Sequence, residues 1–251
     1  AEIRQGLKAA LTDNKLVPVF CGAAELTCGI APLMDFISTT APDPSGTIES
    51  AKDVSDNDVD VAVSADGETS CYIFKTSIDQ FSGKLSFVKV VTGNLAPDSD
   101  LFNSNKNSKQ RVGKVFRTLG KKLIDATDLA AGDIGVLTKL DTIVTNDTLC
   151  TSNNLVTYKS IQVPQPVHSL AVFAASKKDE DKMNQFLQRA ADEDMTFTLT
   201  YNAETKQTVI SGMGELHINM ILAGIKEHQK VEVETKVPRV PYRETITKSA
   251  D

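Results

Sequence analysis

His217 is the side chain in this sequence that most invites an acid–base role, because histidine titrates near neutral pH. Such a role would need a serine, a cysteine or a carboxylate within reach. The one nearby candidate is Glu215, which would point to another side of a helix expected over residues 215–228. The pattern therefore favours a helix-face histidine that packs at a domain boundary, and we predict no catalytic residue.

The cysteines and the paired carboxylates could in principle bind a metal ion, but their spacing argues against it. No CxxC pair and no histidine cluster is present, which favours idle thiols in a reducing compartment over a zinc site. The acidic stretch 53–60 lacks the spacing of a calcium loop. Acidic pairs at 180–181 and 192–194 fall at the two ends of an expected helix, where solvation explains them. We predict no metal site. The cysteines are Cys21, Cys28, Cys71 and Cys150.

Phosphoryl transfer needs a phosphate-binding loop with its lysine, magnesium ligands and a group that positions water. The 251 residues contain no GxxxxGK[ST] loop, no DxxG that leads a switch segment and no NKxD motif. We therefore expect this stretch neither to bind nor to hydrolyse GTP by itself. It is predicted not to be an enzyme and to need no cofactor.

Basic residues between positions 84 and 122 could contact RNA, although the chain as a whole is acidic. The formal net charge of −6 disfavours a protein that coats nucleic acid through bulk charge, but it permits a local basic surface. On composition alone, a solvated rim explains these residues equally well. The candidates for RNA contact are Lys84, Lys106, Lys109 and Arg111.

Composition is that of an ordinary globular chain, with 41% hydrophobic and 24% charged residues. No apolar run approaches the about 20 residues that a membrane span needs. The first 15 residues are charged and amphipathic, unlike a signal peptide. We therefore expect a cytoplasmic protein with neither membrane nor DNA as a partner.

The elements change character along the chain, which predicts several domains. Residues 1–40 contain a helix (2–11), a buried strand (16–21), a small-residue turn (22–24) and a second helix (30–37). This order is typical of the closing unit of an α/β domain. Residues 41–66 are rich in proline, glycine and aspartate, and we expect an exposed linker.

Residues 67–152 contain short strands separated by turns, which predicts a closed β-barrel. The alternation across 84–90 suggests that Leu85 and Phe87 share one face, with Val90 out of phase. Residues 163–240 follow the order strand, helix, strand, strand, helix, strand, which predicts a ferredoxin-like α+β sandwich. Its second helix is expected to turn Leu216, Met220 and Ala223 inward, together with Ile221 and Ile225. The expected barrel strands are 71–76, 84–92, 99–103, 111–119, 134–139 and 148–150.

Several local motifs resemble those of elongation factor G, in that family's order and spacing. Val-Pro-Val-Phe-Cys-Gly-Ala-Ala stands at 17–24, and Gly-Lys-Leu-Ser-Phe at 83–87. Ser-Gly-Met-Gly-Glu-Leu-His at 211–217 precedes Pro-Tyr-Arg-Glu-Thr-Ile at 241–246, and this combination is specific. The resemblance covers nearly the whole chain and implies an internal piece of a translational GTPase.

The resemblance also implies a role for each part of the chain. Residues 1–40 would end a GTP-binding domain of P-loop type, with Ala23 and Ala24 meeting the guanine by their backbone in the parent protein. Residues 67–152 would be the domain II barrel that contacts small-subunit RNA and protein of the ribosome, and 163–240 would be domain III. Leu216 and His217 would face the GTPase domain, where fusidic acid binds, and 241–251 would begin domain IV. The parent would use GTP and Mg²⁺ to move tRNA and mRNA.

Two rival readings remain open at this point. One is a piece of a ribosomal-protection GTPase that removes tetracycline; the other is a free-standing barrel module that binds RNA or protein. The sequence also departs from the family at Phe173-Ala174-Ala175, Met195 and Ala223-Gly224. These departures suggest a divergent paralogue with altered coupling or weakened fusidic acid binding.

Overall fold

The computed structural model describes residues 2–79 and 82–242, which fall into two compact units, Ala1–Thr47 and Ile48–Asp251. In the first unit, helix α1 (Glu2–Thr12) contacts helix α2 (Ile30–Thr40). The ring of Phe20 packs edge-on against Phe36 of α2, with 4.9 Å between ring centroids.

The strand predicted over residues 16–21 is not formed in this unit. The segment is extended, but it pairs with no other described segment, and Val17 and Val19 are exposed. A buried parallel strand needs neighbours on both sides to satisfy its backbone. Residues 16–21 have the apolar pattern of such a strand, but no described strand lies beside them to pair with.

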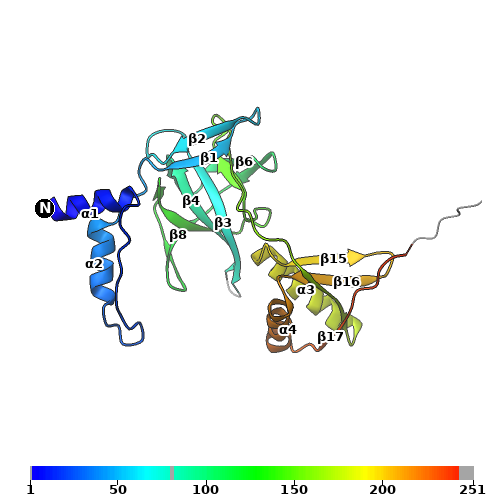
Figure 1. Ribbon diagram of the computed structural model, residues 1–251. Coiled ribbons are helices and arrows are strands. Elements are labelled where there is room, and N and C mark those ends of the chain that lie inside the picture. The colour runs from blue at the N-terminus through cyan, green and yellow to red at the C-terminus, as the bar shows by residue number, and fades with distance from the viewer. Residues whose placement is uncertain (1, 80–81, 243–251) are drawn as a thin grey trace, which may run out of the picture. The chain divides into compact units, whose positions relative to one another are not determined.

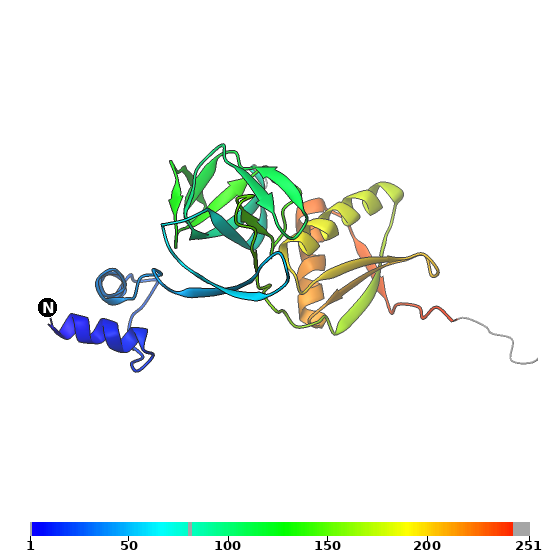
Figure 2. The same ribbon diagram turned by 90° about the horizontal axis from the view of Figure 1, so that it is seen from above.

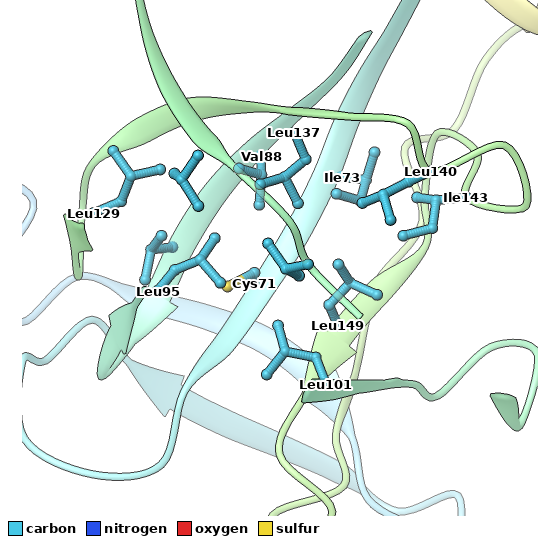
Figure 3. Packing of buried hydrophobic residues seen from close by; sticks show 13 residues of the cluster. Cys71, Ile73, Val88, Leu95, Leu101, Leu129, Leu137, Leu140, Ile143 and Leu149 are labelled. Carbon is cyan, nitrogen blue, oxygen red and sulfur yellow. The ribbon is translucent and has the colours of Figure 1, made fainter. Parts of the chain in front are cut away.

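The barrel in the second unit is built from eight antiparallel strands in the order β7-β6-β12-β3-β4-β11-β8-β9. These strands curl around an apolar interior (Figures 1 and 2). Figure 3 shows its centre, where Cys71, Ile73, Val88, Leu137 and Leu149 pack together. The short strands β5 (Asn94–Leu95) and β10 (Leu129–Ala130) pair beside them. The bounds are β3 Ser70–Asp79, β4 Gly83–Thr92, β6 Asp100–Asn103, β7 Ser108–Arg111, β8 Val115–Leu119, β9 Lys122–Asp125, β11 Ile134–Thr138 and β12 Thr148–Cys150.

One detail of the predicted barrel was wrong. The strand expected over 111–119 is two strands, because the connection after Arg111 bonds elsewhere: Val112 N donates to Ser99 O, and Asp98 N donates to Gly113 O. Along β4 the expected alternation is present, with Leu85 and Phe87 on one face and Val90 on the other. Ser86, Val88 and Val90 are buried, whereas Leu85 and Phe87 are half-buried.

Residues 41–66 are not a simple linker. They contain strands β1 (Ile48–Lys52) and β2 (Asp58–Ala62), which form a sheet with β13 (Thr157–Tyr158) in the order β13-β1-β2. Asp53 shapes the turn between these strands, since its Oδ1 accepts hydrogen bonds from Ser55 N and Asn57 N, whereas Asp56, Asp58 and Asp60 are exposed. A second apolar cluster fills the space beside this sheet. It comprises Ala51, Val63, Val91, Cys150, Val156 and Tyr158.

The remaining elements form the predicted ferredoxin-like sandwich, with antiparallel strands in the order β15-β16-β14-β17. Ser176 caps α3, accepting a hydrogen bond from Asp179 N. The core joins both helices to the sheet through Met183, Leu187, Ile210 and Ile225, among others. The bounds are β14 His168–Ala174, α3 Lys177–Glu193, β15 Thr198–Asn202, β16 Gln207–Gly212, α4 Glu215–Gln229 and β17 Val233–Lys236.

The predicted inner face of α4 was right at Ile221 and Ile225, which pack in the core, and wrong at the other three positions. Ile218 and Ile225 are buried, whereas Leu216, Met220 and Ala223 are exposed. Two apolar stripes run along this helix, and periodicity alone does not say which of them meets the sheet.

Candidate functional sites

The loop that carries Ala23 and Ala24 is closed by a short antiparallel bridge. Ala23 N donates to Cys28 O over 3.0 Å, and Cys28 N donates to Ala23 O over 3.1 Å. Gly29 has a φ of 78°, and a Cβ there would lie 2.7 Å from Cys21 O. The two sides of the loop therefore approach so closely that a side chain at Gly29 would not fit.

The backbone N–H of Ala24 is free to meet a ligand. Within the described residues it donates no hydrogen bond, while Ala24 O accepts one from Thr27 N over 3.1 Å. Thr27 has a φ of 52°, an uncommon conformation for a β-branched residue. The loop thus presents an unpaired amide on a tightly turned backbone. An unpaired amide of this kind can donate to a carbonyl acceptor.

Two of the four predicted RNA-contact residues are committed to internal contacts. Lys84 Nζ donates to Asp141 O over 3.0 Å. Lys106 Nζ donates to Thr142 O over 2.5 Å and to Asp147 Oδ2 over 2.8 Å. Asp147 is only 3% exposed. Both lysines therefore hold the loop before β12 in place.

The buried Asp147 needs these partners, because a buried carboxylate without donors is strongly disfavoured. Its Oδ2 also accepts hydrogen bonds from Asn103 Nδ2 and Val144 N, each over 2.9 Å. Sequence reasoning missed this role of Lys106, since Asp147 lies far along the chain.

The other two predicted residues are exposed on β7. Lys109 points to solvent, and Arg111 has a side chain that is 70% exposed and lies 3.8 Å from Asp98. Arg111 also lines a groove of about 960 Å³ together with Lys114 and Lys139. The structure therefore brings Arg111 together with two lysines that are not among the four candidates. Lys84 and Lys106 instead form hydrogen bonds within the barrel.

His217 is half-buried at the start of α4 and is held by two hydrogen bonds. Its Nδ1 accepts from Met213 N over 3.1 Å, which places the ring proton on Nε2, and Nε2 lies 3.1 Å from Asp194 Oδ2. The ring also packs edge-on against Phe197. His217 therefore ties the start of α4 to the turn that follows α3, and no nucleophile adjoins it among the described residues.

Asp194 is tuned by the same contacts. Burial alone would raise the pKa of Asp194, but hydrogen bonds from the side chain and backbone of Thr196, together with nearby His217, outweigh burial. The pKa consequently lies below its usual value of 3.8. This carboxylate stays charged and serves as an anchor.

Leu216 lies on the opposite, outward side of α4. Its side chain is 77% exposed, and Met220, one turn further along, is 68% exposed. Met213 continues the stripe at 38%. Two exposed apolar side chains on α4, with a third just before the helix begins, are typical of a surface that meets another protein domain.

The described residues contain no group of three or more histidine, cysteine or acidic side chains arranged to hold a metal ion. Among the helices that the structure describes, none is both long and apolar enough to cross a membrane.

Comparison with known proteins gives consistent matches along the chain. Residues 68–152 match the family described as "Elongation factor G domain 2", and residues 163–237 match "Elongation Factor G, domain III". An elongation factor G from Chlamydia caviae is 34% identical over 250 residues, which is 99% of this chain and 36% of that protein. A crystal structure of a Thermus thermophilus protein matches with a TM-score of 0.74 and 25% identity, covering 98% of this chain and 34% of that one. The chain thus spans about a third of the length of these relatives.

Proposed function

This chain belongs to the elongation factor G family, and from that premise we propose that it supplies the ribosome-contacting barrel and the coupling sandwich of a GTP-dependent translocation factor. The single observation that carries the proposal is the order of the matches. A barrel at 68–152 and a sandwich at 163–237 follow each other as the family's second and third domains. The boundaries that we assign from sequence, 1–40, 41–66, 67–152, 163–240 and 241–251, remain part of the proposal, and 243–251 lie outside the described residues.

In the whole protein, GTP and Mg²⁺ would be held mainly by segments other than these 251 residues, which lack the phosphate-binding motifs. This chain would contribute the loop at Ala23 and Ala24, whose free amide supports a guanine contact. Ala23 has no side-chain donor, and its backbone N–H and C=O are both bonded to Cys28, so the contact would fall to the amide of Ala24. The contact would therefore depend on loop shape rather than on a side-chain donor.

Contact with ribosomal RNA would come from the exposed part of the barrel. Lys109 and Arg111 are open to solvent and suit phosphate contacts. Lys84 and Lys106 were candidates for the same role, but their hydrogen bonds favour a structural one. The cytoplasmic location expected from the sequence fits this proposal and is part of it.

The outward stripe Met213–Leu216–Met220 would face the GTP-binding domain. Its exposed apolar area supports the interdomain role predicted for Leu216. For His217 the geometry favours a supporting role, in which its hydrogen bonds to Met213 and Asp194 hold the start of α4 in place. Changes at His217 would thus act through the shape of the α4 start.

The direct test is cosedimentation of the chain with purified small ribosomal subunits. We expect retention at low salt that weakens as salt is raised, since phosphate contacts release counterions. Serum albumin in the same gradient controls for trapping. Loss of retention at every salt concentration would contradict the proposal for this chain.

The two rival readings are separated with the full-length parent. Ribosome-stimulated GTP turnover that drives translocation supports the elongation-factor role. Turnover that instead releases bound tetracycline would indicate a ribosomal-protection factor. The free-standing module is disfavoured because the relative aligns with 99% of the chain, including residues before the barrel.

A further inference from the structure

The segment that joins β2 to β3 contains Asp66-Gly67, which is the only Asp-Gly or Asn-Gly pair in the sequence. In such a pair the side-chain carboxyl group lies within reach of the next backbone nitrogen, so the two can close a five-membered ring. A side chain on the second residue hinders this attack, and glycine has none. The pair is therefore the most reactive combination of an aspartate with its following amide that the sequence offers.

The structure leaves both reacting groups without partners. Within residues 2–79 and 82–242, the Gly67 N–H donates no hydrogen bond, and the Asp66 carboxylate forms neither a hydrogen bond nor an ion pair. Asp66 is held through its backbone instead, since its N–H donates to Ser64 Oγ over 3.1 Å. The buried carboxylate of Asp147, by contrast, is fixed by several donors. A carboxyl group without such donors is free to turn toward the amide.

The backbone at Gly67 also has room to move. Residues 65–68 are exposed and belong to no strand. Gly67 has a φ of 111°, and a Cβ there would meet no atom within 4 Å. An exposed segment with few bonds opens at low free-energy cost, so the fold does little to prevent the ring from closing.

The two ends of this segment, unlike its middle, are fixed to the end of β4. Gly93 N donates to Ser64 O over 2.9 Å, and Thr92 Oγ1 donates to Glu68 O over 2.6 Å. The carbonyl oxygen of Gly67 lies so near Gly93 that a Cβ on Gly93 would be 2.9 Å from it. A longer main chain between these two ends would therefore disturb the hydrogen bond of Thr92 and the packing on Gly93.

We propose that Asp66 is a modification site, at which the chain converts spontaneously to isoaspartate through a succinimide. The Gly67 nitrogen bonds to Asp66 Cγ, and the carboxyl OH leaves with the amide proton as one water molecule. Water then opens the ring at either carbonyl carbon. Opening at Cγ restores aspartate, whereas opening at the main-chain carbonyl carbon routes the chain through the side chain. Reactant and product have the same atoms, and the reaction needs no oxidant or cofactor.

The product has a defined chemical partner. Isoaspartate adds one methylene group to the main chain and converts the former main-chain carbonyl of Asp66 into a free carboxylate. An isoaspartyl methyltransferase transfers the methyl group of S-adenosylmethionine to an oxygen of such a carboxylate and leaves S-adenosylhomocysteine. The methyl ester closes again to the succinimide with loss of methanol, so the change is reversible. The exposed position of residues 65–68 suits recognition by an enzyme of this class.

The experiment ages the whole chain at physiological temperature and neutral pH and measures isoaspartate with a purified isoaspartyl methyltransferase and tritiated S-adenosylmethionine. Peptide mapping should locate the label at Asp66. We expect the folded chain to react within about tenfold of the rate of a free peptide of residues 61–72, because the fold leaves this amide open. A slower reaction of the folded chain, or label at another residue only, would overturn the inference.

Three variants test the chemistry. Asp66→Glu keeps the charge but would need a six-membered ring, so it should lose the label. Asp66→Asn should form the succinimide faster, with loss of ammonia instead of water. The matched control is Asp98→Glu, at another exposed aspartate, whose N–H donates to Gly113 O over 3.0 Å. This control should keep the label, and equal loss in Asp66→Glu and Asp98→Glu would overturn the assignment.

A melting experiment tests the effect on the barrel. Chain that contains isoaspartate, separated by ion-exchange chromatography, should melt about 2–4 °C below the unmodified chain, as expected for the loss of one hydrogen bond. Repair with the methyltransferase and unlabelled S-adenosylmethionine should restore the original melting temperature. Equal melting temperatures before and after modification would overturn the predicted effect on the end of β4.

Discussion

Lys106 illustrates how a surface lysine can be a structural residue. Its ammonium group neutralises Asp147, whose side chain is 4% exposed, while its own side chain is 36% exposed. We expect Lys106→Met to lower the free energy of unfolding by about 1–3 kcal/mol, below the 3–5 kcal/mol for a fully buried pair because water reaches the lysine. Urea unfolding followed by circular dichroism measures the change.

The exposed Lys109 is the matched control for that experiment. Lys109→Met should stay within about 0.5 kcal/mol of the unmodified chain. Equal effects of the two substitutions would show that the bond to Asp147 is unimportant. The sequence could indicate that both residues are basic, but not that one has a buried partner 41 positions away.

Asp194 makes the sandwich sensitive to acid. Its pKa is lower in the folded chain than the usual 3.8, so it stabilises the fold above that value and the contribution is lost as pH falls through the folded pKa. We therefore expect the unfolding free energy to drop below about pH 4 more steeply in the unmodified chain than in Asp194→Asn. Parallel pH profiles of the two proteins would contradict this account.

At the scale of elements, the turn after β4 depends on Gly93. Its φ is 70°, and a Cβ there would lie 2.9 Å from Gly67 O and from backbone atoms of Thr69. Gly120, in the turn between β8 and β9, has a similar φ of 59° but open space around it. Gly93→Ala should destabilise the barrel by about 3 kcal/mol or more, and Gly120→Ala by only about 1–2 kcal/mol.

Thermal denaturation of the two alanine variants distinguishes the effect of space from that of conformation. A loss at Gly120 as large as that at Gly93 would mean that backbone strain alone decides both. Gly93-Asn94 indicates a turn in the sequence, but the close approach at Gly93 comes from a segment 24 to 26 residues earlier.

The elements themselves were predictable to different degrees. Helix α3 follows from its cap at Ser176 and its apolar spacing, which are local features. The inward face of α4 was only partly predictable, because it depends on which side the neighbouring sheet lies. The strand expected at 16–21 does not form for a related reason, since a strand needs neighbouring strands to pair with.

At the scale of the whole molecule, the barrel needs the sheet β13-β1-β2 beside it. Ala51 and Tyr158 from that sheet cover Val91 and Cys150, which the barrel alone would expose. We expect a fragment of residues 48–160 to be monomeric and to melt cooperatively, whereas one of 67–152 should aggregate or melt at lower temperature. Size-exclusion chromatography and calorimetry compare the two, and equal behaviour would favour the shorter boundaries.

The pairing of β1 with β13 also bears on how the chain carries mechanical load. Ala51 pairs with Tyr158, and Lys159 N donates to Ser50 O, so the chain enters and leaves this sheet at the same end. A force applied to the two flanking segments would therefore break the hydrogen bonds between β1 and β13 one after another, rather than all at once. Tension transmitted along the polypeptide would separate β1 from β13 first, while the barrel interior stays intact.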